Sequence, residues 1–278
     1  NGVFCLENNI DMSGVEFNKI GFNLYEMFSG TFNGNGFVIS NLTYITGREI
    51  YVGVFGYTSN ATIINLGIEN VDISANGHLV GGMIGAIDGG VLANCYSTGS
   101  VKTSLSPSNA LVGGLVGYQI KGIIDACYNA CCVSANVDSE VPVRVGGIAG
   151  EQYSGRISNC YNTGSVNSSS ATNTYRGGLV GNQGAAVIIN CYSRGSIFPQ
   201  DSGQFAGGLV GASTGDVINS YWDTEVSSFT ISAGGKGRTS SQLKESSNYV
   251  GWNDPNQLWT INEGVDFPRL NWEGQPGI

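Results

Sequence analysis

The sequence predicts an all-β fold, a right-handed parallel β-helix (β-solenoid) whose coils are repeats of roughly 31 residues, with a cap at each end. A glycine-rich phrase recurs five times at a nearly constant spacing, which indicates a repeat protein. The apolar runs between the glycines are short and rich in Val, Ile, Leu and Tyr, as is typical of strands. A β-propeller is the alternative architecture, but its blades would not need columns of identical residues.

The first repeated phrase is Gly-Gly-Leu-Val-Gly or a close variant of it. Its first glycine lies 30 to 33 residues after that of the preceding copy, and a shorter copy begins at Val52. In a β-solenoid, equivalent positions of successive coils stack at the strand spacing of about 4.8 Å. The phrase therefore defines residues 51–222 as the stacked region. Its first glycines are Gly81, Gly113, Gly146, Gly177 and Gly207.

The second phrase is Asn-Cys-Tyr-Ser-Thr-Gly-Ser-Val, and two units contain degenerate copies of it. The residue three positions before the cysteine is always branched and apolar, which predicts an inward column. Asparagine tolerates the left-handed backbone region, and stacked amides bond to one another, so we expect a corner at the asparagine. The apolar column is Leu92, Ile124, Ile157, Ile188 and Val217, and the corner column is Asn94, Ala126, Asn159, Asn190 and Asn219.

A corner would turn the cysteines inward and the tyrosines that follow them outward. Without a corner, strict alternation along the strand would reverse both orientations. The cysteine column is Cys95, Cys127, Cys160 and Cys191, and the tyrosine column is Tyr96, Tyr128, Tyr161, Tyr192 and Tyr221.

Residues 1–50 and 223–278 lack the repeat and are predicted to cap the two ends, because an uncapped coil exposes unpaired strand edges. The N-terminal part contains a turn signal at Gly34-Asn-Gly36. In the C-terminal part, residues 240–246 have the composition of a short helix. Residues 1–278 are expected to form one domain, of about nine coils if every 31 residues made one. An aromatic plug at the C-terminal end is expected from Trp252, Trp259, Phe267 and Trp272.

Composition limits the classes of function. Charged residues make up 12% of the chain and the net charge is −9, which argues against nucleic acid as a partner, because that partner requires a basic face. No apolar run approaches the roughly 20 residues of a membrane-spanning helix, so no membrane insertion is expected. An acidic surface rich in Gly, Ser and Asn fits a secreted or surface-exposed protein. The chain begins with Asn1, which fits a removed signal peptide or a larger parent chain.

The seven cysteines leave two interpretations open. The four in the column are either reduced, buried fillers or disulfide-linked between neighbouring coils, whose stacked Cα atoms would lie within bridging range. Cys131 and Cys132 replace the Gly-Ser of the sister repeats. Cysteines about 30 residues apart have no zinc signature, so we expect no metal site and no cofactor.

The two phrases together resemble the GLUG motif, which recurs in bacterial surface proteins such as filamentous-haemagglutinin-like adhesins and in the non-catalytic region of some IgA-specific metallopeptidases. The resemblance covers residues 28–272, and the third unit departs most from the pattern, at Ala126 and Cys131. It implies a repeat architecture and a location outside the cell or on the bacterial cell surface. It brings no catalytic residue.

Some polysaccharide lyases and hydrolases are also parallel β-helices, and their catalytic sites depend on acidic residues. Glycoside hydrolysis needs two carboxyl groups about 5 to 9.5 Å apart. The acidic candidates share no column of the repeat, and the single histidine, His78, lies in a variable loop. We therefore expect no enzyme activity and no catalytic residue. The candidates are Asp88, Asp125, Glu151, Asp216, Asp223 and Glu225.

The tyrosine column is the candidate binding site, with Tyr96, Tyr128, Tyr161, Tyr192 and Tyr221 as its members. Outward rings could stack on sugars or contact a protein partner, or they could pack under the variable loops and stabilise neighbouring coils. Two functions from different classes follow. The first is an adhesin-like module that presents loops to a host or microbial surface glycan or protein, or acts as a rigid spacer. The second is a carbohydrate-active β-helix enzyme or its glycan-binding accessory domain.

Overall fold

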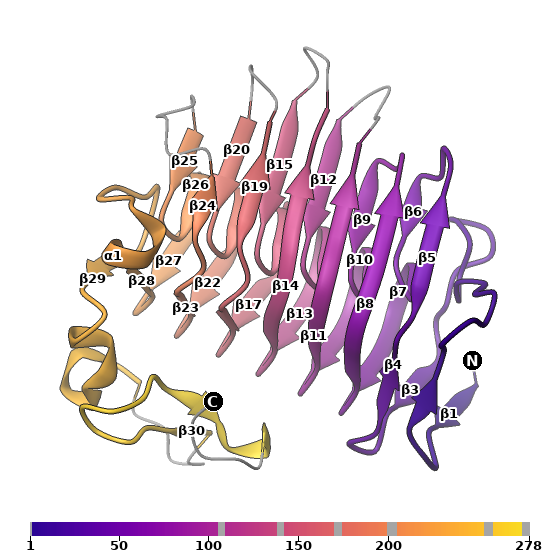
Figure 1. The fold of residues 1–278 in the computed structure, drawn as a ribbon, viewed down its shortest axis with the longest axis horizontal. Helices are drawn as coiled ribbons and strands as arrows, with labels where there is room; N and C mark the ends of the chain where they lie inside the picture. Colours follow the sequence, from indigo (N-terminus) through magenta and orange to yellow (C-terminus); the bar gives the residue numbers. More distant parts are fainter. Residues whose placement is uncertain are drawn as a thin grey trace.

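The computed structural model describes residues 2–104, 109–137, 142–169, 174–198, 205–252 and 258–273. These residues form a β-solenoid of about seven turns with almost no helix, which confirms the predicted fold class (Figure 1). The stack has fewer turns than the expected nine because the chain leaves it after Arg238, the last residue of its final strand.

Three parallel sheets run along the solenoid, and each strand pairs with the equivalent strand of the next coil. Sheet A comprises β1 (Val3–Cys5), β3 (Thr31–Asn33), β7 (Phe55–Ile64), β10 (Ile84–Ala93), β13 (Val116–Asp125), β16 (Ala149–Gln152), β17 (Arg156–Ser158), β21 (Val180–Gln183), β22 (Val187–Ile189), β26 (Val210–Ser213) and β27 (Asp216–Ile218). Sheet B comprises β2 (Ile10–Asp11), β4 (Val38–Ser40), β5 (Thr43–Thr46), β8 (Gly67–Ala75), β11 (Tyr96–Thr103), β14 (Tyr128–Ala135), β18 (Tyr161–Asn162), β19 (Val166–Ser168), β23 (Tyr192–Ser193), β24 (Ile197–Phe198), β28 (Tyr221–Asp223) and β29 (Lys236–Arg238). Sheet C comprises β6 (Tyr51–Val52), β9 (Leu79–Gly81), β12 (Ala110–Gly113), β15 (Val143–Gly146), β20 (Thr174–Gly177) and β25 (Phe205–Gly207).

The Gly-Gly phrase forms the corner between sheets C and A, where neighbouring coils lie very close. A Cβ on Gly147 would collide with the carbonyl oxygen of Gly178 in the next coil and with the side-chain amide of Asn162. A side chain at this position would therefore push two coils apart, which explains why glycine recurs there.

The corner between sheets A and B lies at the repeated asparagine, as expected. Asn94, Asn159, Asn190 and Asn219 have φ values of 52°, 52°, 54° and 46°, and Ala126 has 50°, all in the left-handed region. Along a strand, side chains alternate between the two faces of the sheet, and the corner interrupts this alternation. The apolar residues and the cysteines on either side of it both point inward and are fully buried: Leu92, Ile124, Ile157, Ile188, Cys95, Cys127, Cys160 and Cys191.

All seven cysteines are free thiols. The four column cysteines lie within the main core, where their sulfurs contact backbone carbonyls, as Cys127 Sγ does with the carbonyl oxygen of Asp125 at 3.1 Å. The structure thus shows the column as reduced, buried fillers. Cys131 is also buried, whereas Cys132 and Cys5 are exposed.

The ends of the stack are closed differently. At the N-terminal end, Leu6, Phe28 and Phe32 join the core. At the C-terminal end, Trp222 and Phe229 close the core, next to the single-turn helix α1 (Thr224–Ser227). The expected helical stretch near residue 240 forms two short 3-10 turns, η1 (Gln242–Lys244) and η2 (Ser246–Asn248). Within the described residues, no helix is long and apolar enough to cross a membrane.

The four aromatic residues predicted as a plug do not enter the end of the solenoid. They belong to residues 249–252 and 258–273, here named the C-terminal segment, which folds back beside the coils (Figure 1). This segment contains the antiparallel pair β30 (Trp259–Thr260) and β31 (Arg269–Leu270) and the 3-10 turn η3 (Asn271–Glu273). A plug fills a cross-section, whereas this segment covers a side of the stack.

Candidate functional site

The tyrosine column points outward, as the corner interpretation predicts, and its members are in register along sheet B. The rings of Tyr96 and Tyr128 stack with centroids 4.8 Å apart, those of Tyr128 and Tyr161 at 5.0 Å, and those of Tyr161 and Tyr192 at 5.1 Å. Their interplanar angles are 9°, 10° and 7°. The repeat therefore produces a continuous stack of parallel phenol rings outside the core.

The C-terminal segment covers most of this stack. The ring centroid of Trp259 lies 6.1 Å from those of both Tyr161 and Tyr192, and the ring centroid of Trp252 lies 6.2 Å from that of Tyr221. Tyr161, Tyr192 and Tyr221 are consequently only 6%, 1% and 2% exposed. These three tyrosines therefore pack under the chain's own C-terminal segment and present no open aromatic surface to a ligand.

Hydrogen bonds fix the segment to the stack. The hydroxyl of Tyr161 donates to Oε2 of Glu273 at 2.8 Å, and that of Tyr192 donates to the carbonyl oxygen of Pro268 at 2.6 Å. The indole Nε1 of Trp252 donates to the carbonyl oxygen of Asn219 at 2.6 Å. The polar tips of Tyr161, Tyr192 and Trp252 are thus all hydrogen-bonded, which makes the cover a specific contact.

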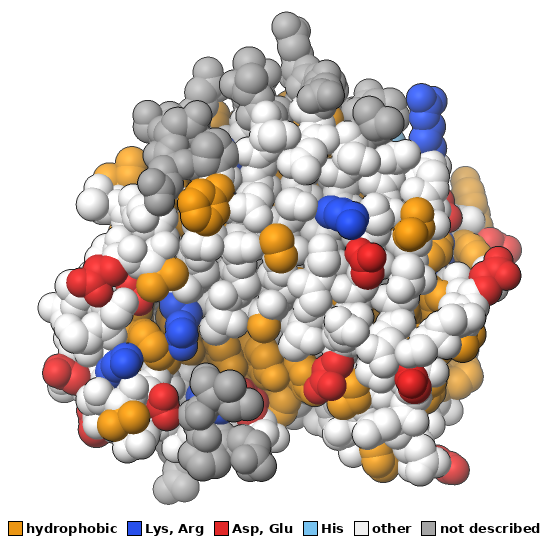
Figure 2. Space-filling model, in the orientation of Figure 1, with side chains coloured by type: hydrophobic (Ala, Val, Ile, Leu, Met, Phe, Trp, Pro, Cys, Tyr) orange, Lys and Arg blue, Asp and Glu red, His pale blue; other side chains and the backbone are white. Residues whose placement is uncertain are grey.

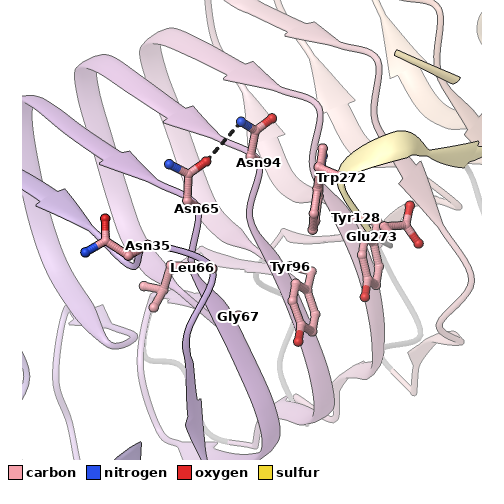
Figure 3. Close-up of a pocket in the computed structure, with 10 residues that line it drawn as sticks. Asn35, Asn65, Leu66, Gly67, Asn94, Tyr96, Tyr128, Trp272 and Glu273 are labelled. Carbon is pink, nitrogen blue, oxygen red and sulfur yellow. Dashed lines mark hydrogen bonds between the residues drawn. The ribbon is translucent and has the colours of Figure 1, made fainter. Parts of the chain in front are cut away.

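The N-terminal end of the stack stays open. Tyr96 and Tyr128 are half-buried, and the ring of Trp272 lies beside them. The ring centroids of Trp272 and Tyr128 are 5.8 Å apart, and the angle between the two ring planes is 22°. Together with three asparagines they surround a cavity of about 470 Å³, here named the asparagine pocket (Figure 3). Its lining is Asn35, Gly36, Asn65, Leu66, Gly67, Asn94, Tyr96, Tyr128, Trp272 and Glu273. Figure 2 shows hydrophobic side chains gathered on this face next to the C-terminal segment.

One wall of the asparagine pocket is a ladder of side-chain amides. Nδ2 of Asn65 donates to Oδ1 of Asn33, and Nδ2 of Asn94 donates to Oδ1 of Asn65, both at 3.1 Å. The ladder stops at Asn94 because the next coil has Ala126 at the corner. Oδ1 of Asn94 points away from Asn65 (Figure 3), and no donor within the described part of the chain occupies it. The interrupted repeat therefore leaves an amide acceptor beside an aromatic wall.

A second cavity of about 370 Å³ is here named the arginine pocket. It shares Tyr128 and Glu273 with the asparagine pocket. The guanidinium of Arg194 lies over the ring of Phe267, 3.9 Å from its centroid. The full lining is Thr98, Tyr128, Ala130, Tyr161, Thr163, Tyr192, Arg194, Asp266, Phe267, Pro268, Arg269 and Glu273.

The electrostatics of the two pockets follow from their burial. Burial raises the pKa of the Tyr96, Tyr128 and Tyr161 hydroxyls well above their usual range, so all three are neutral donors at physiological pH. Burial also raises the pKa of Glu273, against the opposing hydrogen bonds that its carboxylate accepts from Leu270 N and Tyr161. The asparagine pocket is therefore polar and aromatic with a single carboxyl group in its lining, whereas the arginine pocket has charged groups of both signs.

The acidic candidates, apart from Asp216, are engaged in structural contacts, and Asp223 and Glu225 share Ser240 as a partner. Asp88 pairs with Lys121 at 3.2 Å and accepts from Tyr57, and Glu151 pairs with Arg144 at 3.3 Å. Asp125 accepts hydrogen bonds from the side chains of Ser158 and Asn159. Asp223 is buried and accepts from the first turn of α1 and from the hydroxyl of Ser240, and Glu225 accepts from the backbone N–H of Ser240. Asp216 is exposed on β27. No group of three or more His, Cys, Asp or Glu side chains that could hold a metal ion occurs among the described residues.

Sequence reasoning found Tyr96 and Tyr128 but missed Trp272, Glu273 and the asparagines of the pocket wall. A signal existed, because Ala126 is the single break in the corner asparagines of the repeat. The loops between units, to which the sequence analysis assigned ligand presentation, lie largely outside the described residues.

Comparisons with known proteins agree with the repeat architecture. The family model described as the GLUG motif matches residues 142–167, which span one glycine phrase and the asparagine phrase that follows it. The crystal structure of a putative immunoglobulin A1 protease from Bacteroides ovatus is similar, with a TM-score of 0.71 and 24% sequence identity. The match covers 97% of this chain and 86% of that one, and it shows a shared fold. No curated protein sequence matches significantly.

Proposed function

We propose that this chain, a GLUG-motif β-solenoid, is a non-catalytic, adhesin-like module that binds a glycan in the asparagine pocket, outside the cell or on a bacterial surface. The observation that carries this proposal is the acceptor of Asn94 beside the rings of Tyr96, Tyr128 and Trp272. A sugar ring offers apolar C–H faces that pack on aromatic rings, and hydroxyl groups that donate to an amide oxygen. A volume of about 470 Å³ lies within the usual range for small-molecule sites.

The contacts of the acidic residues support a function without catalysis. Asp88 and Glu151 are each neutralised by a basic neighbour, and Asp223 caps α1. The one carboxyl group that lines the asparagine pocket, Glu273, is already engaged by Tyr161 and the backbone of Leu270. Hydrolysis or elimination would need a carboxylate free to act on the sugar.

The test is binding of the purified chain, displayed in multivalent form, to an array of mucin and plant glycans. We expect binding to neutral sugar residues, and a loss of about tenfold or more in Tyr96→Ala, because truncating a central aromatic side chain costs about 1.4 kcal/mol or more. Tyr25→Ala is the matched control, since Tyr25 is 94% exposed and lies outside the pocket lining.

Two results would count against the proposal. If the parent chain binds no glycan, a spacer or protein-binding role replaces it. If Tyr96→Ala binds as well as Tyr25→Ala, the site lies elsewhere. Release of new reducing ends or unsaturated sugars from a bound glycan would instead favour a carbohydrate-active enzyme.

A further inference from the structure

Arg194 departs from the repeat. The third residue after the column cysteine is Thr98 in the first full unit, Ala130 in the next, then Thr163, and Arg194 in the fourth. All four line the arginine pocket, so the solenoid stacks them along one side of that cavity. A long cationic side chain replaces small ones only at the end that Phe267 covers.

The position of Arg194 leaves its hydrogen-bonding edge available. The guanidinium packs on the ring of Phe267 through its face, 3.9 Å from the centroid. Stacking of this kind uses the face of the planar group and keeps its N–H donors in the plane. Within the described residues, Arg194 forms no ion pair with a carboxylate at 4.0 Å or less.

The surroundings of Arg194 contain charges of both signs. Arg269 is the second cation that lines the cavity, and Asp266 and Glu273 are the carboxyl groups. The oxygens of Glu273 accept hydrogen bonds from the Tyr161 hydroxyl and the Leu270 amide, and both Glu273 and Asp266 would oppose a bound anion when ionised. Thr98 and Thr163 add hydroxyl groups on the same side of the cavity as Arg194.

The two pockets are neighbours. Tyr128 and Glu273, the last residue of η3, line both. Equivalent tyrosines are about one strand spacing apart, so a ligand that reaches from Tyr96 past Tyr128 to the coil of Arg194 spans three coil spacings, or about 15 Å. A chain of two or three sugar residues has that length.

We propose that the arginine pocket binds the carboxylate of an acidic sugar, so that the glycan recognised by this chain carries a sialic or uronic acid next to the residue held in the asparagine pocket. This inference rests on the proposed glycan-binding function and specifies its ligand class. The guanidinium of Arg194 supplies the charge-assisted donors for the carboxylate. Tyr128 is shared by the two sugar positions.

The test compares each acidic ligand with its neutral counterpart on the full chain. The two pairs are 3′-sialyllactose with lactose, and trigalacturonic acid with its carboxyl-reduced form, which separates a sialic from a uronic acid. We expect the parent to prefer one acidic form by about tenfold, as one charge-assisted contact provides. Arg194→Thr, which installs the residue of two sister units, should remove the preference and leave neutral binding unchanged. Asp266→Asn should increase the preference.

Equal affinity of the parent for acidic and neutral partners would overturn the acidic-sugar inference and leave the glycan-binding function standing. A preference that persists in Arg194→Thr would also overturn it. Failure of the parent to bind all four ligands and the wider glycan array would remove both proposals together. Thermal unfolding of each variant, matched to the parent, shows that the comparisons concern folded protein.

Discussion

The indole Nε1 of Trp272 donates a hydrogen bond of 3.1 Å to the carbonyl oxygen of Ala126, which lies 146 residues earlier in the chain. Ala126 occupies the corner at which the other full units have asparagine, and both residues belong to the aromatic cluster over sheet B. The departure from the repeat and the end of the C-terminal segment therefore meet at one point. An amide side chain at position 126 would extend the ladder from Asn94 into the space beside the indole.

Restoring the repeat at this corner is expected to loosen the C-terminal segment. Ala126→Asn suits the left-handed backbone better than alanine, but its side chain competes with Trp272 for space and completes the ladder at Asn94. We expect faster hydrogen exchange in residues 258–273 and loss of glycan binding. Ala126→Gly, which suits the same backbone and adds no side chain, should retain both properties; similar behaviour of the two variants would contradict the explanation.

The glycines of the phrase are expected to be intolerant of a single methyl group. Gly147→Ala places a Cβ against the carbonyl of Gly178, so we expect a loss of about 3 kcal/mol or more in the free energy of unfolding. Gly47→Ala is the control, because a Cβ at Gly47 meets no atom within 4 Å. Urea unfolding of the two variants measures the difference, and equal stabilities would show that the corner can adjust.

Docking of the C-terminal segment is expected to weaken as the pH rises. Burial raises the pKa of Glu273 above its usual value of 4.5, so the folded state holds this proton more tightly than the unfolded state does. The stabilisation is complete below pH 4.5 and is lost as the pH rises through the raised pKa. Hydrogen exchange of residues 258–273 at several pH values measures the effect.

The variant Glu273→Gln distinguishes the effect of Glu273 on this pH dependence from the effects of the other carboxyl groups. The amide is neutral at every pH and can still accept the hydrogen bond from Tyr161. We expect the variant to lose the pH dependence of docking and to be better protected than the parent at pH 7. A parent and variant with parallel pH profiles would assign the effect to another group.

Thiol labelling of the native protein is expected to modify two of the seven cysteines, the exposed Cys5 and Cys132. Burial raises the pKa of Cys131 to about 12, and it raises the pKa of Cys95 and Cys160 as well, so these thiols stay protonated and covered. All seven should react after unfolding without reductant. Fewer than seven would reveal disulfides between coils, and more than two in the native state would reveal an open column.

Most of the fold could be predicted from the sequence repeat. The spacing of the glycine phrase predicted the solenoid, and the asparagine before Cys95 predicted the corner that sends Cys95 inward and Tyr96 outward. These features are local and occur in each coil, so one sequence contains several copies of the same information. A glycine at a close corner or a left-handed asparagine has a physical cause within one coil and its neighbour.

The path of the C-terminal segment could not be predicted in this way. Its contacts, such as Glu273 with Tyr161 and Trp272 with Ala126, join residues 112 and 146 positions apart, and no repeat encodes them. The aromatic residues after position 250 could have filled the end of the core as well as its side. Trp222 and Phe229 already occupy the end, which leaves the outer tyrosine stack as the apolar surface available to them.

Repeat proteins commonly gain or lose whole units during evolution, because each coil contacts only its neighbours. Here the C-terminal segment runs back along several coils and places one aromatic group after another against particular tyrosines. A duplicated unit between Tyr128 and Tyr221 would carry Trp272 one coil away from Ala126. The number of coils in this solenoid and the length of its C-terminal segment therefore have to change together.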